Sequence, residues 1–258
     1  MRLDALFLPR ELDARPRPER VAVVIDVIRA TSTIVTAFRH RVRSVLPVAS
    51  VEEARQAHVS APDALLAGER GGQRISGFDL GNSPREFTPE AVGNRDVVLT
   101  TSNGTKTLRA VGEGRAVAIG AFLNRSAVGR WLLARREDAL IVCSGYEGIF
   151  SLEDAVCAGA VVDRMVWEGA SVTLGDGAQA CQALWARYGS DVPGLLRSTG
   201  WGRHIVGIGL GADLDVCAQV DITDVVPVMT GGRIAGEAPG FRPGGMFPAA
   251  GGLDSERP

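Results

Sequence analysis

Three loops rich in serine, threonine, asparagine and glycine follow apolar stretches that we expect to be strands. Val21–Asp26 runs into Arg29-Ala-Thr-Ser-Thr33, Val97–Thr100 into Thr101-Ser-Asn-Gly-Thr-Lys106, and Ala139–Cys143 into Ser144-Gly-Tyr-Glu-Gly148. A helix that begins after such a loop presents free backbone N–H groups and the positive end of its dipole, which bind phosphate and other anions. The three loops together predict a site for a charged, phosphorylated substrate.

Four acidic residues accompany these loops and are candidates for metal binding or catalysis. They are Asp26 at the end of an apolar strand, Glu69 and Asp79 around a glycine-rich loop, and Asp154 in the first turn of an expected helix. Mg²⁺ prefers oxygen ligands and is often held by one or two carboxylates with water and substrate phosphate. Asp26 is therefore the first candidate ligand, and nucleophilic attack by its carboxylate is the alternative. Glu69 and Asp79 are further metal candidates, Asp79 could instead stabilise a turn, and Asp154 either caps its helix or takes part in catalysis.

Positive groups in the same loops could hold the oxyanions of the substrate. Arg29 lies three residues after Asp26, and its guanidinium could bind phosphate or carboxylate in a bidentate manner. We assign Asp26, Arg29 and Asp154 to catalysis. Lys106 is the single lysine among 28 basic residues; a GC-rich genome explains the general bias toward arginine, and we expect Lys106 itself to bind an oxyanion. The expected substrate-binding residues are Thr31, Ser32, Asn82, Ser83, Thr101, Ser102, Asn103, Gly104, Thr105, Lys106, Ser144 and Gly145.

Composition limits the class of protein. The chain has 258 residues, 45% of them hydrophobic, which is enough for one large α/β domain or two small ones. A net charge of −2 argues against nucleic-acid binding, and no apolar run is long enough to cross a membrane. The N-terminus does not resemble a signal peptide, and the four cysteines form no C-x-x-C pair. We therefore expect a cytoplasmic protein with free thiols.

Expected strands and helices alternate along the first part of the chain. Apolar stretches that read as strands include Val21–Asp26, Ser44–Val48, Ala64–Ala67, Val97–Thr100, Ala116–Ile119 and Ala139–Cys143. This pattern predicts an α/β fold with a mostly parallel or mixed sheet flanked by helices. We expect residues 1–170 to carry the main site motifs and residues 171–230 to form a helical C-terminal part. Residues 231–258 are rich in glycine and proline and are predicted to be a flexible tail.

Other phosphatase and nucleotide-binding signatures are missing from the sequence. Asp26 is followed by Val27 and Ile28, so there is no D-x-D pair of the haloacid dehalogenase type. The C-x5-R spacing of cysteine phosphatases occurs from Cys181 to Arg187, but this stretch reads as the interior of a helix. The three histidines are scattered along the sequence, which argues against a zinc site.

Several motifs occur in an order that resembles one protein family. They are Asp26-Val-Ile-Arg-Ala-Thr-Ser-Thr-Ile-Val-Thr-Ala37, Gly68-Glu-Arg70, Gly77-Phe-Asp-Leu-Gly-Asn-Ser-Pro84, Thr101-Ser-Asn-Gly-Thr-Lys106, Phe150-Ser-Leu-Glu-Asp-Ala155 and Asp215-Val-Cys-Ala218. From Met1 to about Thr230 the chain is similar to the 2-phosphosulfolactate phosphatases of coenzyme M biosynthesis. The resemblance implies a Mg²⁺-dependent hydrolase that converts (R)-2-phospho-3-sulfolactate to 3-sulfolactate. It also implies a mixed α/β fold unlike that of the common phosphatases.

Two functions are consistent with these residues. The first is a Mg²⁺-dependent phosphatase for 2-phosphosulfolactate or a related phosphorylated 2-hydroxy acid. The second is a non-catalytic protein that binds an anionic metabolite with the same loops. The acidic set favours the enzyme, because carboxylates near the ligand repel an anion unless a cation lies between them. The expected partner is a small anionic substrate, without nucleic acid or membrane, and association into a homo-oligomer is left open.

Overall fold

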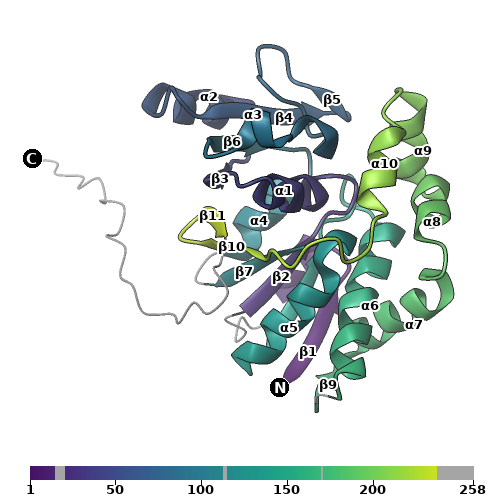
Figure 1. Cartoon of the computed structure of the whole chain (residues 1–258). Coiled ribbons are helices and arrows are strands. Elements are labelled where there is room, and N and C mark those ends of the chain that lie inside the picture. Colours follow the sequence, from purple (N-terminus) through teal and green to yellow (C-terminus); the bar gives the residue numbers. More distant parts are fainter. Residues whose placement is uncertain (15–20, 113–114, 170, 237–258) are drawn as a thin grey trace, which may run out of the picture.

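The computed structural model describes residues 1–14, 21–112, 115–169 and 171–236, and it has an α/β fold in which helices flank one mixed sheet (Figure 1). The predicted fold class is therefore confirmed. The strands are β1 (Arg2–Leu6), β2 (Val21–Ile25), β3 (Ser44–Pro47), β4 (Leu65–Arg70), β5 (Gln73–Arg74), β6 (Asp96–Thr100), β7 (Ala116–Gly120), β8 (Ala139–Cys143), β9 (Thr173–Leu174), β10 (Pro227–Thr230) and β11 (Arg233–Gly236). Their order across the sheet is β5-β4-β6-β3-β11-β10-β7-β2-β8-β1-β9.

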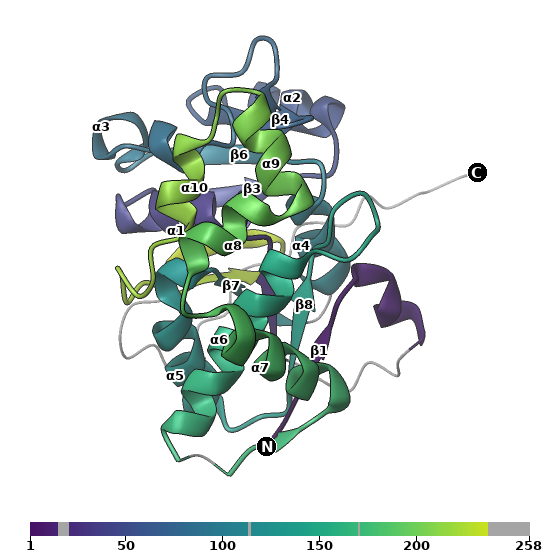
Figure 2. The same ribbon diagram turned by 90° about the vertical axis from the view of Figure 1, so that its right-hand side faces the viewer.

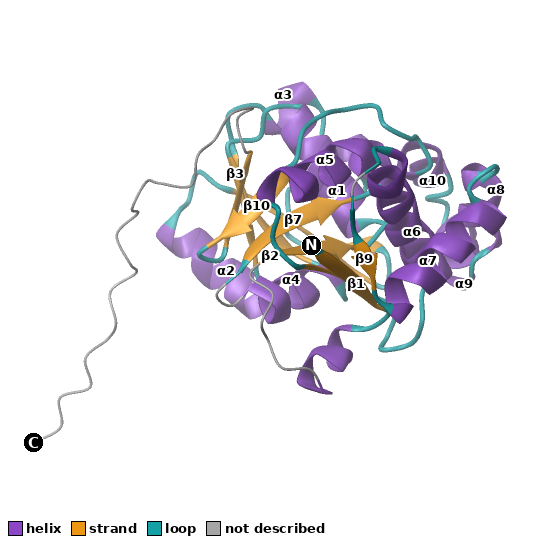
Figure 3. Cartoon of the chain, turned by 90° about the horizontal axis from the view of Figure 1, so that it is seen from below, coloured by secondary structure: helices purple, strands orange, loops and turns teal. Residues whose placement is uncertain are grey.

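The described helices pack around this sheet (Figure 3). The α-helices are α1 (Ala30–Arg39), α2 (Val51–Ser60), α3 (Pro89–Val92), α4 (Gly104–Gly112), α5 (Arg125–Arg135), α6 (Leu152–Trp167), α7 (Asp176–Tyr188), α8 (Val192–Ser198), α9 (Gly200–Gly207) and α10 (Ala212–Cys217). Short 3-10 turns are η1 (Pro9–Ala14), η2 (Pro84–Glu86) and η3 (Phe122–Asn124). Among the described residues, no helix combines the length and apolar character needed to cross a membrane.

The central strand β2 shows why the sheet needs helices around it. All five of its residues are buried, which is typical of a strand covered on both faces. Val21, Val23 and Ile25 pack into one apolar cluster with residues of α5, α6 and α7. Ala22 and Val24 belong to a second cluster with residues of α1 and α4. The alternation along one strand thus builds two cores, one for each set of helices.

A C-terminal hairpin joins the two halves of the sheet. In one half β3 and β4 are parallel to β6, and in the other β2 is parallel to β7 and β8. Between them, β10 pairs antiparallel with β7, β11 pairs antiparallel with β10, and β11 pairs antiparallel with β3. Three antiparallel pairings in succession reverse the strand direction from one half to the other. The ends of β2 and β6 nevertheless meet at one pocket, because the sheet turns between its halves (Figure 1).

The prediction of a tail from residue 231 is wrong for its first six residues. Gly231 and Gly232 have φ values of 60° and 80°, and they form the two-residue turn between β10 and β11. Such turns need positive φ at both central residues and therefore favour Gly-Gly. The glycine content that suggested a tail thus marks a hairpin in the middle of the sheet. Residues 237–258 lie outside the described part of the chain.

Helices α8, α9 and α10 lie together on the side of the molecule that faces the viewer in Figure 2. Their buried residues include Leu196, Ile205 and Leu214, which join the same apolar cluster as α5, α6 and α7. Helices of the region 171–230 therefore share a core with the first part of the chain.

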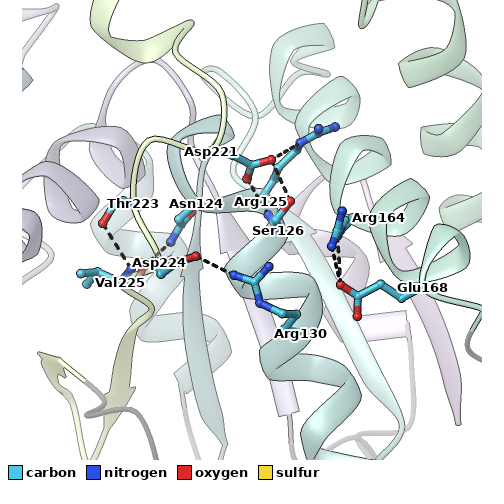
Figure 4. Close-up of polar contacts among 10 residues, drawn as sticks. All are labelled: Asn124, Arg125, Ser126, Arg130, Arg164, Glu168, Asp221, Thr223, Asp224 and Val225. Atoms are coloured by element: carbon cyan, nitrogen blue, oxygen red, sulfur yellow. Dashed lines mark hydrogen bonds and ion pairs between the residues drawn. The ribbon is translucent and has the colours of Figure 1, made fainter.

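The segment between α10 and β10, residues 218–226, is called the strap here. It is fixed to the start of α5 (Figure 4). Asp221 accepts hydrogen bonds from the Ser126 amide at 2.8 Å, the Ser126 hydroxyl at 2.7 Å and Arg125 Nε at 2.9 Å. Arg130 pairs with Asp224 farther along the strap, and Asn124 donates to the Val225 carbonyl. Burial raises the pKa of Asp221, but the hydrogen bonds from Ser126 and Arg125 outweigh burial and leave this pKa below its usual range. The strap thus supplies an acidic group to the N-terminus of α5, where the helix dipole favours it.

Helices α6 and α7 approach each other closely at Gly159. A Cβ atom at this position would lie 1.9 Å from the backbone oxygen of Cys181, which cannot move without shifting α7. We expect Gly159→Ala to lower the free energy of unfolding by at least about 2 kcal/mol, as measured by urea denaturation. The control is Gly129→Ala in α5, where the nearest atom is Arg164 Cγ at 3.3 Å and the helix gains propensity. Equal unfolding free energies for the two variants would contradict this account of the packing.

Candidate active site

A pocket lies where the loops after β2 and β6 meet the β4–β5 hairpin and α9. Its lining residues are Asp26, Ile28, Arg29, Glu69, Asn82, Thr101, Asn103 and Trp201. Six of these were predicted as site residues, and they come from four separate stretches of the sequence. The structure therefore brings the first two predicted loops and the glycine-rich stretch to one place.

Asp26 follows β2, and its side chain is 8% exposed. Its Oδ1 accepts a hydrogen bond from the Ala30 amide, the first residue of α1, at 3.2 Å. The backbone of Asp26 is fixed by Thr31, whose hydroxyl donates to the Asp26 carbonyl and accepts from the Asp26 amide. No described residue donates to Oδ2 of Asp26. A Cβ atom on Gly104, the first residue of α4, would lie 2.6 Å from this oxygen. The carboxylate therefore lies beside the N-termini of two helices with one oxygen open.

Burial raises the pKa of Asp26 to about 7. The hydrogen bond from Ala30 lowers it, the negative charges of Glu69 and Glu153 raise it, and the positive charge of Arg29 lowers it. Desolvation is the largest of these effects, and with the two negative charges it outweighs the hydrogen bond from Ala30 and the charge of Arg29. An added cation beside Oδ2 would reverse this balance.

Asp154 joins two loops around the site. It lies in the first turn of α6, is 3% exposed, and accepts hydrogen bonds from the Val27 amide at 2.8 Å and the Gly145 amide at 3.2 Å. Burial and the charges of Asp26 and Glu153 hold the pKa of Asp154 well above its usual range. Both of its oxygens face backbone amides, so the observed geometry gives it the role of positioning the loops after β2 and β8.

Glu69 has a similar position between two other loops. Its Oε1 accepts from the Ser102 amide at 2.7 Å and its Oε2 from the Gly72 amide at 2.8 Å. It lines the pocket and is 4% exposed. Both oxygens already have donors, so Glu69 fixes the loop before α4 against the β4–β5 hairpin.

Arg29 is buried and held by a carboxylate that the sequence analysis did not single out. Its Nη1 lies 2.5 Å from Oδ2 of Asp213 in α10, and its Nη2 donates to the Gly72 carbonyl. The Ser83 hydroxyl donates to the other oxygen of Asp213 at 2.6 Å. The predicted residue Ser83 thus acts on the pocket through Asp213 and Arg29.

The loop before α4 offers unused donors. Thr101 and Thr105 satisfy each other, since each hydroxyl accepts from the backbone amide of the other. The amides of Asn103 and Gly104 have no acceptor among the described residues. Asn103 lines the pocket, and its Oδ1 accepts from the Glu147 amide at 3.4 Å. This arrangement suits an oxyanion at the start of α4.

Two buried oxygen atoms in predicted site residues lack hydrogen-bond partners. They are Oδ1 of Asn82 and Oγ of Ser144, and both side chains are at most 5% exposed. Leaving a buried polar atom unpaired costs about 1–3 kcal/mol, so an unpaired one often marks the place of a ligand or water. Asn82 also lines the pocket that contains Asp26.

Other predicted residues lie outside the pocket lining. Lys106 is exposed on α4. Asp79 is exposed, and its Oδ2 accepts from the Leu66 amide at 2.8 Å, which is the turn-stabilising alternative considered for it. Ser32 donates to the Val27 carbonyl. Gly145 adopts a φ of 65° and donates its amide to Asp154.

An aromatic wall closes one side of the pocket, and the sequence analysis did not identify it. Trp201 in α9 stacks between Tyr146 and His204, with ring centroids 4.5 Å apart on each side. Its indole N–H donates to the Ile28 carbonyl at 2.7 Å, and His204 Nε2 lies 3.2 Å from the Gly71 carbonyl. The sequence of α9 gives no sign of this contact, because the partners are distant in sequence.

The burial of Asp26 predicts how stability depends on pH in protein treated with a chelator. Its pKa is higher in the folded protein (about 7) than in the unfolded chain (about 3.9), so ionisation disfavours folding as pH rises between these values. Asp26→Asn keeps the acceptor for Ala30. We expect its free energy of unfolding, relative to that of the parent, to rise as pH increases from about 4 to 7. Urea denaturation across this range measures the difference, and a difference independent of pH would contradict the assignment.

Comparison with known proteins shows the family to which the chain belongs. The sequence model of the family 2-phosphosulpholactate phosphatase matches residues 6–232. A protein of Symbiobacterium thermophilum named probable 2-phosphosulfolactate phosphatase is 41% identical over 217 residues, which are 83% of this chain and 93% of that protein. A protein of Clostridium acetobutylicum with the same name is 33% identical over 235 residues, 91% of this chain and 100% of that protein. The chain therefore belongs to the 2-phosphosulfolactate phosphatase family of enzymes.

Proposed function

We propose that this enzyme hydrolyses (R)-2-phospho-3-sulfolactate, or a closely related 2-phospho-hydroxy acid, to the hydroxy acid and phosphate with the help of Mg²⁺. The names of its relatives support the substrate, since both proteins described above are named for 2-phosphosulfolactate. Four buried free cysteines are in keeping with a reducing compartment, and we place the enzyme in the cytoplasm.

The observation that carries this proposal is the pairing of open acceptors with open donors in one pocket. Asp26 Oδ2 and Asn82 Oδ1 are acceptors without a donor among the described residues. The amides of Asn103 and Gly104 and the guanidinium of Arg29 are donors beside them. A phosphate ester that shares a cation with the acceptors and gives its other oxygens to the donors would satisfy both sets.

The residues present fit Mg²⁺. Among the described residues, no three histidine, cysteine or acidic side chains are grouped to hold a metal by themselves. Mg²⁺ needs no such group, because it usually keeps several waters and takes one or two carboxylates plus substrate phosphate. We assign Asp26 as the carboxylate ligand and Asn82 as a carbonyl ligand. When bound, Mg²⁺ supplies positive charge to the phosphoryl oxygens and offsets the acidic pocket.

The residues of the chain have distinct parts in this reaction. Arg29 and the amides at the start of α4 donate hydrogen bonds to phosphoryl oxygens, which carry more charge in the transition state. Glu69 and Asp154 keep the loops after β2, β6 and β8 and the β4–β5 hairpin in register, and Trp201 shields the site from water. Cys143 takes no part as a nucleophile, because burial raises the pKa of its thiol far above the neutral range. Water or the Asp26 carboxylate remains as the attacking group.

Replacing Asp26 tests the central assignment. We expect Asp26→Asn to fold, since Asn keeps the hydrogen bond to Ala30, and to lose activity by a factor on the order of 10²–10³ or more. Phosphate release from 2-phosphosulfolactate at several Mg²⁺ concentrations measures the effect, and calorimetric titration with Mg²⁺ alone should show weakened binding. Near-normal turnover with unchanged Mg²⁺ dependence would exclude Asp26 as ligand and as nucleophile. Specific binding of 2-phosphosulfolactate by the parent protein without phosphate release would instead favour the non-catalytic binder.

Gly104 gives an independent test, because it needs no charge change. A methyl group there would lie 2.6 Å from both Asp26 Oδ2 and Ala30 Cβ, in the space assigned to the ligand. We expect Gly104→Ala to lower kcat/KM by about 100-fold, since small displacements of reacting groups have effects of this size. The control is Gly200→Ala, also the first residue of a helix, where a Cβ has no neighbour within 4 Å. Full activity of Gly104→Ala would place the ligand elsewhere.

A further inference from the structure

Arg29 is fixed by groups from three distant parts of the chain. Asp213 in α10 binds its Nη1, and the side chains of this pair are only 2% and 1% exposed. The carbonyl of Gly72, in the β4–β5 turn, accepts from Nη2. Ser83 donates to the free oxygen of Asp213 at 2.6 Å, so both carboxylate oxygens have a donor.

The remaining donors of Arg29 are free to serve the pocket. A guanidinium has five N–H groups in a rigid plane. Asp213 and Gly72 accept from two of them, and no described residue accepts from the other three. Since Arg29 lines the pocket, these three are available to oxygen atoms of a bound ligand. Holding one edge of the plane fixes the direction of the other.

We propose that Asp213 is a positioning residue of the phosphatase site, which orients Arg29 toward the transferring phosphoryl group and offsets its charge. The inference rests on the proposed function. Helix α10 thereby contributes to catalysis through Arg29.

Stability alone is a weak explanation for this contact. Removing two charges from water costs about as much as their attraction returns, and an apolar pair often stabilises a core equally well. Ser83 adds a third polar group to the same buried cluster, which increases the desolvation cost. A guanidinium that is fixed at the edge of a ligand pocket can bind oxygen atoms of the ligand, which an apolar pair could not do.

The first test is Asp213→Asn, which preserves shape. The Asn Oδ1 can still accept from Arg29, and its amide can donate to Ser83, but the charge is lost. Because Arg29 remains in the pocket with a less fixed orientation, we expect kcat to fall about 10- to 100-fold while KM rises about threefold. An unchanged kcat in folded protein would overturn the proposal.

A double-mutant cycle separates positioning from a general structural role. If Asp213 acts through Arg29, then Asp213→Asn should change kcat by less than about twofold in an Arg29→Met background. If the reductions in kcat of the two single variants multiply in the double variant, Asp213 acts independently of Arg29, and this result would contradict the inference. The matched control is Asp215→Asn in the same helix, because Asp215 pairs with Arg197 at the surface, with side chains 62% and 44% exposed. We expect this control to keep full activity.

Binding of inorganic phosphate gives a readout that does not need turnover. In the presence of Mg²⁺, calorimetry should show that Asp213→Asn raises the phosphate Kd about threefold in the parent and not in the Arg29→Met background. A parent protein that binds phosphate in this pattern but fails to hydrolyse 2-phosphosulfolactate would refute the proposed substrate and leave the positioning role standing. If Asp213→Asn does not fold, Ser83→Ala replaces it in the same cycle, with an expected two- to fivefold loss of kcat. No loss of kcat there would overturn the proposal.

Discussion

The Asp26 carboxylate is buried at the end of a strand, where little water can solvate its charge. The surrounding loops and helix ends offset part of this desolvation cost. Two helices, α1 and α4, begin beside it, and their N-termini favour negative charge. These contacts do not fully offset desolvation, as its raised pKa shows. The neighbouring acids Glu69 and Asp154 each bind two backbone amides, so they can remain near Asp26 while they fix the loops. In the proposed function, a bound cation offsets the negative charge that remains in the site.

Much of this arrangement could be read from local sequence. Apolar runs ending in Asp26 and Thr100 predicted strands that do lead to the pocket, because burial on both faces leaves a clear signal in the sequence. Strand β1 gave no such signal: its five residues include Arg2 and Asp4, and its pairing with β8 and β9 decides its conformation. The turn after β10 and strand β11 were missed because glycine and proline content was given more weight than the Gly-Gly turn signal.

Contacts between distant segments could not be predicted in the same way. Asp213 lies 184 residues after Arg29, and nothing near either residue in sequence indicates the other. Trp201 reads as an ordinary apolar residue of a short helix, yet it reaches Ile28 across the pocket. Conversely, the position of Lys106 beside an anion-binding loop suggested a contact, while the helical turn directs it to the surface. Residue type and spacing indicated six of the residues that line the pocket, and tertiary packing decided which other residues join them.

The place of the β10–β11 hairpin has a consequence for synthesis of the protein. Strands β1 to β9 all leave the ribosome before the hairpin that joins the two half-sheets. Until then the nascent chain has two unpaired edges, on β3 and on β7, and each can pair with another chain. The edge of β7 carries Val117 and Ile119, and that of β3 carries Val45 and Leu46, and exposed apolar edges promote association during folding. The last strands of the fold therefore also protect it, and chaperone binding to the growing chain would be most useful in the interval before Thr230 and Arg233 emerge.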